Sequence, residues 1–301
     1  SVLLLLPWLI HAPSRVAVQT PDTVWSAPLN LSQSGAASQP MLFAAPDGAL
    51  QAFWWDRFDG LTTAIAQGQT WSAPRTVQIY VTELRGDRVV SRPLEAMPVL
   101  EADAAGHVHA FWQDRQDAET GLRPLLHSRL SVGSTDWSPP DVVSAANAVA
   151  ATVALDAAAL PGGGLALAYI REARTASDPP GLYVRRLNGQ GAWEPPTLVH
   201  PSPYLRLSNP AALRLRLTGA LDGALYVAWT DSSLAQTLYA RSGDGGLTWS
   251  APQPMATFAS LALAPVSAIV SRVAPLPRGG LLFLHETQSS GVCALYPQLQ
   301  G

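Results

Sequence analysis

A turn glycine that opens an apolar run recurs through the chain at an almost constant spacing. Its five occurrences lie 58, 58, 59 and 57 residues apart, at Gly48, Gly106, Gly164, Gly223 and Gly280. Self-similarity at a period of this size is typical of repeat architectures, in which each repeat is one supersecondary unit that stacks on its neighbours. A unit of this length holds about four short strands, which predicts a blade of a β-propeller.

The segments that follow these glycines have the composition of strands. They are apolar, aromatic and partly alternating, as expected of buried strands bounded by turn residues. They comprise Ala49–Asp56, His107–Asp114, Leu165–Glu172, Ala224–Asp231 and Leu281–Glu286. The 26 Pro and 23 Gly residues interrupt the chain too often for long helices. The sequence therefore predicts an all-β fold.

A second repeated feature is a tryptophan followed two or three residues later by proline. Its most complete version is the stretch Ser242-Gly243-Asp244-Gly245-Gly246-Leu247-Thr248-Trp249. This stretch resembles the Asp-box, the S-x-D-x-G-x-T-W hairpin of sialidase-like (BNR) β-propellers. All five defining positions match, namely Ser242, Asp244, Gly246, Thr248 and Trp249. The resemblance implies that these residues are structural and lie on the face opposite the ligand site.

Five repeats predict a five-bladed propeller over residues 15–301, with blades near 39–78, 97–144, 150–199, 209–257 and 265–301. The last unit lacks its own Trp-Ser-Ala-Pro strand, whereas Trp25-Ser26-Ala27-Pro28 has no blade before it. We therefore expect residues 15–31 to complete the last blade, which would remove free sheet edges. Because residues 16–19 and 292–296 both resemble third strands, a six-bladed ring is the alternative.

Residues 1–14 form an apolar leader that is too short to span a bilayer. The leader resembles the apolar part of a secretory signal. We expect an exported protein, secreted or at the cell surface, in which this segment acts as an anchor or as a strand docked on the propeller. Membrane attachment, or assembly into a larger complex, would then involve the same segment.

Charge and residue usage exclude several classes of function. The net charge is −3 and no basic cluster occurs, so nucleic acid is not an expected partner. All 19 basic residues are Arg, which excludes Schiff-base enzymes, P-loop hydrolases and Ser-x-x-Lys acyl enzymes. The single Cys293 excludes an internal disulfide and a cysteine-based metal cluster. No cofactor or metal is expected, and we interpret His107 and His109, which share one face of a strand, as polar residues on a solvated face.

An acidic residue ends the second strand of every predicted unit. These residues are Asp56, Asp114, Glu172, Asp231 and Glu286. Propeller symmetry places them on one rim, opposite the Asp-box hairpins, together with Arg57, Arg115 and an exposed Trp55. Such a rim suits a network of sugar hydroxyls, a cation or an acid/base pair. The alternative hypothesis is that each acid caps its own turn.

Two kinds of glycoside hydrolase are the enzymatic alternatives. The family resemblance implies an arginine triad for a catalytic sialidase, to which Arg214 and Arg272 could belong, but no Arg-Ile-Pro motif occurs and no Tyr nucleophile is identified. A five-bladed enzyme of the arabinanase type would use three carboxylates, with Glu101, Asp103 and Asp156 as candidates. The leading hypothesis is a glycan- or protein-binding module, or an assembly module, without a recognisable catalytic constellation.

One insertion separates the first two units. Residues 79–84 and 88–90 predict an added β-hairpin around Arg85-Gly86-Asp87. We interpret Gly-Asp there as a turn rather than as an adhesion motif. A polar loop over residues 171–181 is the other insertion, and both are expected on the ligand face.

Overall fold

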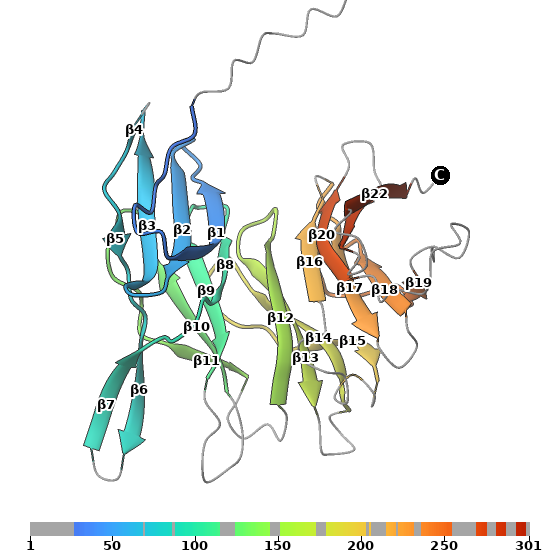
Figure 1. Cartoon of the computed structure of the whole chain (residues 1–301). Coiled ribbons are helices and arrows are strands. Elements are labelled where there is room, and N and C mark those ends of the chain that lie inside the picture. The colour runs from blue at the N-terminus through green and yellow to red at the C-terminus, as the bar shows by residue number, and fades with distance from the viewer. Residues whose placement is uncertain are drawn as a thin grey trace, which may run out of the picture. The chain divides into compact units, whose positions relative to one another are not determined.

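The computed structural model describes residues 27–68, 70–85, 88–114, 124–144, 151–172, 179–202, 205, 215–220, 222–231, 236–254, 269–275, 281–286 and 293–298. The chain divides into two units, residues 1–30 and 31–301, and the account below concerns the second. Every element in the described part is a β-strand (Figure 1). No helix among the described residues is long and apolar enough to cross a membrane.

Five antiparallel sheets follow one another at the positions of the predicted repeats. The first sheet contains β1 (Ala37–Ala44), β2 (Leu50–Asp56), β3 (Gly60–Gln67), β4 (Thr70–Trp71) and β5 (Arg75–Thr76). The second contains β8 (Val99–Ala102), β9 (Val108–Gln113), β10 (Leu125–Leu130) and β11 (Asp141–Ser144). The third contains β12 (Ala151–Ala159), β13 (Leu165–Glu172), β14 (Gly181–Leu187) and β15 (Thr197–Pro201). Within each, neighbours in sequence pair in order, except that β4 and β5 both pair with β3.

The fourth sheet contains β16 (Leu215–Gly219), β17 (Leu225–Asp231), β18 (Gln236–Ser242) and β19 (Gln253–Pro254), again in sequence order. The fifth contains β20 (Ile269–Pro275), β21 (Leu281–Glu286) and β22 (Cys293–Gln298). β22 pairs with β21, as the predicted third strand near residues 292–296 requires. The other predicted third strand, at residues 16–19, lies outside the described residues.

The recurring glycines occupy one conformation. The φ angles of Gly48, Gly106, Gly164 and Gly223 are 83°, 84°, 83° and 83°, each in the turn between the first and second strands of a sheet. This left-handed region favours glycine because other residues carry a Cβ that crowds the backbone there. Shared backbone geometry explains why the sequence period was visible. Gly280 lies outside the described residues.

The core lies between consecutive sheets. One cluster joins Phe53 and Leu61 of the first sheet to Leu100 and Trp112 of the second. Corresponding clusters join the second sheet to the third and the third to the fourth. The first strands also meet in succession, since β12 contacts both β8 and β16, and β16 contacts β20. The predicted all-β propeller is confirmed, whereas the number of blades and their closure by residues 15–31 stay predictions.

The inserted hairpin is present as a separate two-stranded sheet of β6 (Tyr80–Arg85) and β7 (Arg88–Pro93) (Figure 1). Gly86 and Asp87, at its tip, lie outside the described residues. The Gln78 side chain donates a hydrogen bond to the carbonyl of Asp59 at 2.9 Å, which fixes the base of the hairpin to the β2–β3 turn. The second predicted insertion extends β13 to Glu172 and continues through residues 173–178, which are also outside the described part.

Candidate functional site

The first of the strand-end acids, Asp56, closes its own turn. Its carboxylate is buried and accepts hydrogen bonds from the Ser34 hydroxyl and from the backbone N–H groups of Phe58 at 2.9 Å and Asp59 at 3.3 Å. The bond from Ser34, followed by that from Phe58, lowers the pKa of this carboxyl below its usual range. This geometry matches the turn-capping hypothesis for Asp56.

The second strand-end acid, Asp114, forms an ion pair with Arg92 of the inserted hairpin. Their side chains are only 17% and 12% exposed, so the pair fixes β7 to the loop after β9. Trp55 is half-buried and packs against the core between the first two sheets, while Arg57 is exposed. Both described acids of the rim are therefore engaged with protein groups.

The remaining rim residues are only partly described. Glu172, Asp231 and Glu286 end β13, β17 and β21, as predicted, but their side chains lie outside the described part. Arg115, Arg214 and the side chain of Arg272 are also outside it. Whether the five acids form one ligand-binding rim stays a prediction.

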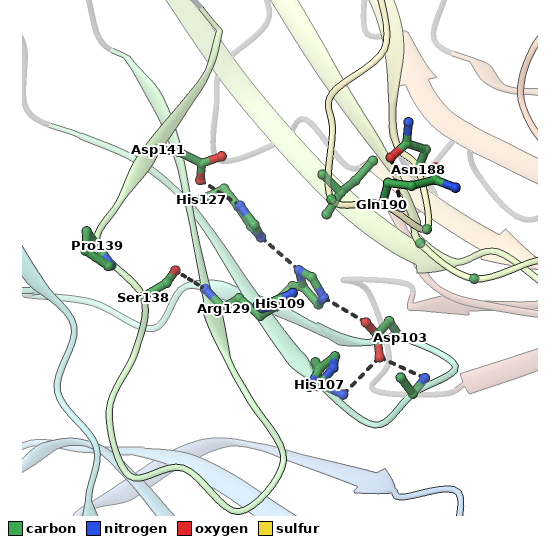
Figure 2. A pocket seen from close by; sticks show the side chains of 16 residues that line it. Asp103, His107, His109, His127, Arg129, Ser138, Pro139, Asp141, Asn188 and Gln190 are labelled. Atoms are coloured by element: carbon green, nitrogen blue, oxygen red, sulfur yellow. Dashed lines mark hydrogen bonds and ion pairs between the residues drawn. The ribbon is translucent and has the colours of Figure 1, made fainter.

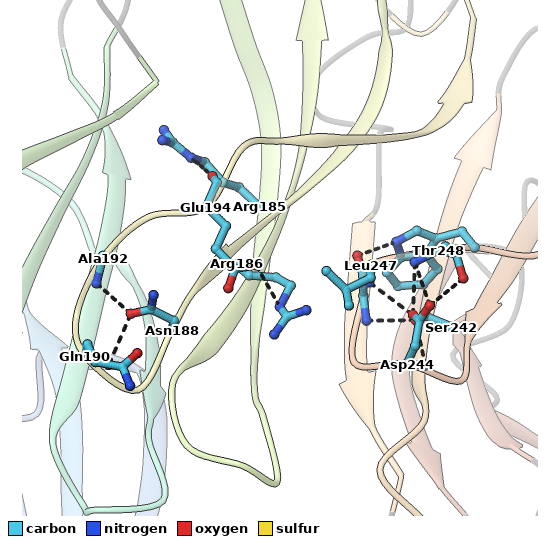
Figure 3. A network of polar contacts seen from close by, with 12 residues as sticks. Arg185, Arg186, Asn188, Gln190, Ala192, Glu194, Ser242, Asp244, Leu247 and Thr248 are labelled. Atoms are coloured by element: carbon cyan, nitrogen blue, oxygen red, sulfur yellow. Dashed lines mark hydrogen bonds and ion pairs between the residues drawn. The ribbon is translucent and has the colours of Figure 1, made fainter.

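The Ser242–Trp249 turn is held by its own side chains (Figure 3). Ser242 donates to Asp244 and accepts the N–H of Gly246, both at 2.7 Å. Asp244 accepts the Thr248 hydroxyl at 2.5 Å and the Thr248 N–H at 2.9 Å. The bonds from Thr248 and Ser242 lower the pKa of Asp244. Trp249 packs against the core between the third and fourth sheets, so these contacts fit the structural role predicted for the five residues.

The turn that follows β14 in the third sheet is also held by one of its own side chains, the amide of Asn188. The Asn188 side-chain oxygen accepts the N–H groups of Gln190 at 3.1 Å and Ala192 at 2.9 Å (Figure 3). Trp193 follows directly and pairs with Leu187 through an isolated bridge. This turn presents the side chains of Asn188 and Gln190 at one wall of a cavity (Figure 2).

We call this cavity the histidine pocket. Its volume is about 430 Å³, and it opens between turns of the second and third sheets. The residues that define it are Asp103, His107, His109, His127, Arg129 and Asp141 from the second sheet, with Gly163, Gly164 and residues 187–191 from the third. It adjoins the beginning of β9, whereas Asp114 follows the other end of that strand.

Strand register brings the two central histidines together. In the β9–β10 pair, His109 lies opposite Arg129 and Phe111 lies opposite His127. Since alternate residues of a strand share one face, His109 and His127 are diagonal neighbours on the same face. Their rings stack with centroids 5.1 Å apart and planes 14° from parallel.

These rings belong to a continuous chain of four side chains (Figure 2). His109 Nε2 lies 3.2 Å from Asp103 Oδ2, and His109 Nδ1 lies 2.8 Å from His127 Nε2. His127 Nδ1 lies 2.7 Å from Asp141 Oδ1. The Trp193 indole N–H extends the chain into the third sheet by donating to Asp141 Oδ2 at 3.2 Å.

Burial and hydrogen bonding set the charges along this chain. Burial, reinforced by the nearby His127, lowers the pKa of His109 to about 4, so His109 is neutral at ordinary pH. Burial also acts to raise the pKa of Asp141, but hydrogen bonds from His127 and Trp193 outweigh it and leave that pKa below its usual value. Asp141 is therefore an ionised acceptor at one end of the chain.

The histidine chain is occupied internally. All four ring nitrogens of His109 and His127 already have partners, so neither ring has a nitrogen available for a ligand in this arrangement. Among the described residues, no group of three or more His, Cys, Asp or Glu side chains is arranged to hold a metal ion. The side chains of Arg129 and Gln190 face the cavity and are exposed, and neither makes a hydrogen bond or ion pair with another described residue.

The three carboxylates considered for an arabinanase-type enzyme have different roles. Asp103 accepts the N–H groups of Ala105 and His107, both at 2.9 Å, and belongs to the histidine chain. Glu101 on β8 accepts the N–H of Ala159 on β12 at 3.2 Å, and Asp156 on β12 accepts the N–H of Leu217 on β16 at 2.8 Å. Burial, partly offset by the bond from Ala159, raises the pKa of Glu101 to about 7.

The expectation of a solvated face was wrong for His109, whose exposed fraction is 3%. Its face is covered because Phe111 and His127 lie on it and Trp193 of the third sheet packs edge-on against both of those rings. His107 is half-buried at the pocket. Sequence reasoning also missed the roles of His127 and Asp141. The even spacing of His107 and His109 was visible in the sequence, but the strand pairing that places His127 beside His109 was not.

No protein-family model matches the chain, and no curated protein matches it. Among solved structures, the chain is similar to an α-L-arabinanase of Penicillium chrysogenum complexed with arabinobiose, with 13% identity, 87% of this chain and 78% of that chain covered, and a TM-score of 0.52. It is also similar to a leech intramolecular trans-sialidase complexed with 2,7-anhydro-Neu5Ac, with 12% identity, 91% and 63% coverage and a TM-score of 0.51. A lectin of Aleuria aurantia in complex with α-methyl-L-fucoside is similar as well, with 11% identity, 85% of this chain and 76% of that chain covered, and a TM-score of 0.44.

At these identities the similarity to the arabinanase and the trans-sialidase shows the fold alone. The chain spans less than two thirds of the trans-sialidase, since it covers 63% of that protein. The comparisons thus agree with the propeller architecture derived from the sheets.

Proposed function

We propose that this propeller is a carbohydrate-binding module and that the histidine pocket is its sugar site. The observation that carries the proposal is a cavity of about 430 Å³ between two turns, whose lining includes charged and polar side chains. This volume lies within the range of about 300–1,000 Å³ that small-molecule sites occupy. The site lies on the side of the sheets that carries the Gly106 and Gly164 turns.

The exposed groups of the pocket suit a hydroxyl-rich ligand. Arg129 offers guanidinium N–H donors, and Gln190 offers an amide that both donates and accepts. The Asn188 oxygen is used by its own turn, which holds the neighbouring Gln190 in place. Gly163 and Gly189 leave the rim without side chains, so a ligand can approach the backbone.

Two proteins with the same fold indicate which sugars to test first. The arabinanase is complexed with arabinobiose, and the trans-sialidase with a sialic acid derivative prepared from 3′-sialyllactose. Calorimetry with arabinobiose and 3′-sialyllactose, followed by a glycan array, tests the proposal directly. Saturable binding of at least one sugar is the expected result.

Point variants locate the site. Each of Gln190→Ala and Arg129→Ala should weaken sugar binding about tenfold, because each removes one or two hydrogen bonds worth about 1 kcal/mol apiece. Gln67→Ala and Arg75→Ala, at exposed positions of the first sheet, are the matched controls and should leave Kd unchanged. Sugar binding that survives both pocket substitutions would exclude the histidine pocket as the site.

A glycoside hydrolase is the second candidate, favoured by Glu101. A carboxyl whose pKa is raised to about 7 stays protonated near neutral pH, as a general acid must, and Asp156 contributes to the shift. We would measure release of nitrophenol from aryl arabinosides and sialosides. Turnover that Glu101→Gln abolishes, while Glu194→Gln retains it, would establish this activity, and absence of turnover would eliminate it.

Two further expectations concern the surface that a partner contacts and the location of the protein. The family resemblance implies a glycan- or protein-binding surface at the other ends of the strands, near Asp56 and Asp114, and this surface is the alternative site if sugar binding survives the substitutions in the histidine pocket. Export to the cell surface or exterior would place the propeller where glycans are displayed. Cell fractionation with a tagged chain tests the location, and recovery in the cytoplasm would contradict it.

A further inference from the structure

The hydrogen bonds of the four-residue chain described above require a definite number of ring protons. It runs Asp103, His109, His127, Asp141, and both of its ends are carboxylates. An ionised carboxylate only accepts hydrogen bonds, so each end requires an N–H from the adjacent imidazole. The central bond, 2.8 Å between His109 Nδ1 and His127 Nε2, requires a third N–H. Two neutral imidazoles carry only two, so three satisfied bonds require one extra proton.

The surroundings place that proton on one ring. His109 is the more deeply enclosed base, with its Nε2–H directed at Asp103, and its low pKa keeps it neutral. A neutral His109 presents an Nδ1 lone pair to its partner. His127 therefore donates from both nitrogens, to His109 on one side and to the half-exposed Asp141 on the other.

We propose that His127 is an imidazolium in this structure and that loss of its extra proton opens the contact between Asp141 and Trp193 at the histidine pocket. The proton would thereby act as a pH-dependent link between the second and third sheets. Its effect on sugar affinity rests on the proposed function, whereas the protonation itself does not.

How firmly each carboxylate is held decides which of them loses its hydrogen bond to the adjacent histidine. Without the extra proton, two nitrogen lone pairs would face each other at 2.8 Å unless one ring moves or gives up a carboxylate. Asp103 is only 13% exposed and is held by the N–H groups of Ala105 and His107. Asp141 is 52% exposed and can turn its carboxylate to water. Release therefore takes place at Asp141, which also carries the bond from Trp193.

The charges around His127 come from both sheets. Asp103 and Asp141 favour the extra proton, and Arg129, which lies opposite His109 in the β9–β10 register, opposes it from an exposed position. From the third sheet, the Cζ atom of Arg185 lies 5.7 Å from the centroid of the Trp193 ring, which packs edge-on against His127. His107 lies at the pocket on the turn beside Asp103.

Nitrogen-15 NMR of the unmodified protein with labelled histidine tests the proton directly. Near pH 5.5 we expect one ring with both nitrogens protonated, joined by a two-bond coupling across N–H···N to a neutral ring with Nε2 protonated. Raising the pH until the doubly protonated ring loses its extra proton should abolish this coupling. The Trp193 indole N–H signal, assigned with a Trp193→Phe variant, should shift at the same midpoint. Two neutral rings throughout, or a Trp193 signal that does not respond, would overturn the inference.

An isosteric substitution supplies the decisive variant. In Asp141→Asn the amide can donate to His127 Nδ1 while its oxygen accepts Trp193, so all bonds are satisfied with two ring protons. The pH response of Trp193 should then disappear. Asp47→Asn, at the exposed first-sheet turn where Asp47 accepts the N–H of Ala49, is the matched control and should keep the response. A response that persists in Asp141→Asn would contradict the mechanism.

Sugar binding is measured separately, with arabinobiose and 3′-sialyllactose. Kd should rise about tenfold between the protonated and deprotonated states of the unmodified protein and stay constant in Asp141→Asn. If neither sugar binds at any pH, the proposed function loses its support, while the NMR titration still decides the protonation. If a sugar binds with the same Kd in both states, the link between proton and pocket is refuted although the site stands.

Discussion

The carboxylate of Glu101 on β8 accepts the backbone N–H of Ala159 on β12 at 3.2 Å, so an acid of one sheet satisfies an edge amide of the next. Asp156 repeats the relationship one sheet further on, where it accepts the N–H of Leu217 at 2.8 Å. First strands expose unpaired amides that need acceptors when buried. Both acids, considered above as catalytic candidates, therefore also hold neighbouring sheets together.

Glu101→Gln should change how stability depends on pH. Burial raises the pKa of Glu101 from 4.5 to about 7, so the unfolded chain loses this proton first, and ionisation costs the folded state up to about 3 kcal/mol. This stability is present below pH 4.5 and is lost as the pH rises through about 7. Gln keeps an oxygen that can accept the N–H of Ala159 but does not ionise, so the free energy of unfolding should no longer fall as the pH rises. Urea unfolding at several pH values measures this free energy.

The control for that experiment is Glu194→Gln. Glu194 lies near the surface in an ion pair with Arg186 at 3.4 Å. Its substitution should not remove the decline in stability toward high pH. An equal change in both variants would show that Glu101 is not its source.

His109→Gln should have the opposite effect. Burial lowers the folded pKa of His109 from 6.5 to about 4, so acid favours the unfolded chain, by up to about 3 kcal/mol. This stability is present above pH 6.5 and is lost as the pH falls through about 4. Gln can donate to Asp103 and accept from His127 without a charge, which removes the acid sensitivity. Unfolding free energies measured from pH 7 down to about 4 test it.

The two titrations offset each other in the unmodified protein, because their windows overlap and their signs are opposite. Each substitution should therefore leave only the pH dependence of the unfolding free energy that the other residue produces. His107→Gln, in the turn directly before β9 and at the pocket surface, is the control and should leave the profile unaltered. An unaltered profile in His109→Gln would refute the burial argument.

Gly164→Ala should destabilise the turn between β12 and β13 by at least about 2 kcal/mol. A Cβ at this position would lie 2.1 Å from the carbonyl oxygen of Leu187, and the φ of 83° adds strain. Gly163→Ala is the matched variant, since its φ is 87° but a Cβ there meets nothing within 4 Å. Thermal unfolding should show a smaller loss of stability for Gly163→Ala. Equal losses would mean that the positive φ alone, and not the contact with Leu187, determines the destabilisation.

Ser242→Ala should destabilise the fourth sheet by about 1–3 kcal/mol, because it leaves the buried N–H of Gly246 without its acceptor. Ser131→Ala, at a turn of the second sheet, is the control. Sugar binding at the histidine pocket should not change in either variant when each is measured well below its melting temperature. Loss of binding with an intact fold would give this turn a role beyond structure.

Much of the architecture could be predicted because backbone conformation constrains residue choice locally. Gly48 and Gly106 were visible as a period since their turns require a positive φ, and the ranges of β13 and β21 matched their predicted segments. The inserted hairpin was predicted for the same reason, from two strand-like runs around a turn dipeptide.

The site depends on relationships that no local pattern contains. His109 and His127 meet through the register of β9 and β10, which are separated by the long segment 114–124, and Asp141 joins them from a third strand. The strand-end acids illustrate the converse. Their repeated position was evident, but Ser34 and Arg92, which engage Asp56 and Asp114, come from segments outside the repeat pattern.

The ties made by Glu101 and Asp156 have a consequence for how such a chain can change its length. A gene that lost the third module would delete both the amide that Glu101 binds and the acid that Leu217 binds, and would leave one orphaned group on each flanking module. The modules look interchangeable in their turns, yet each is fitted to the two it touches. Duplication or deletion of a module would therefore succeed only with compensating substitutions in its neighbours.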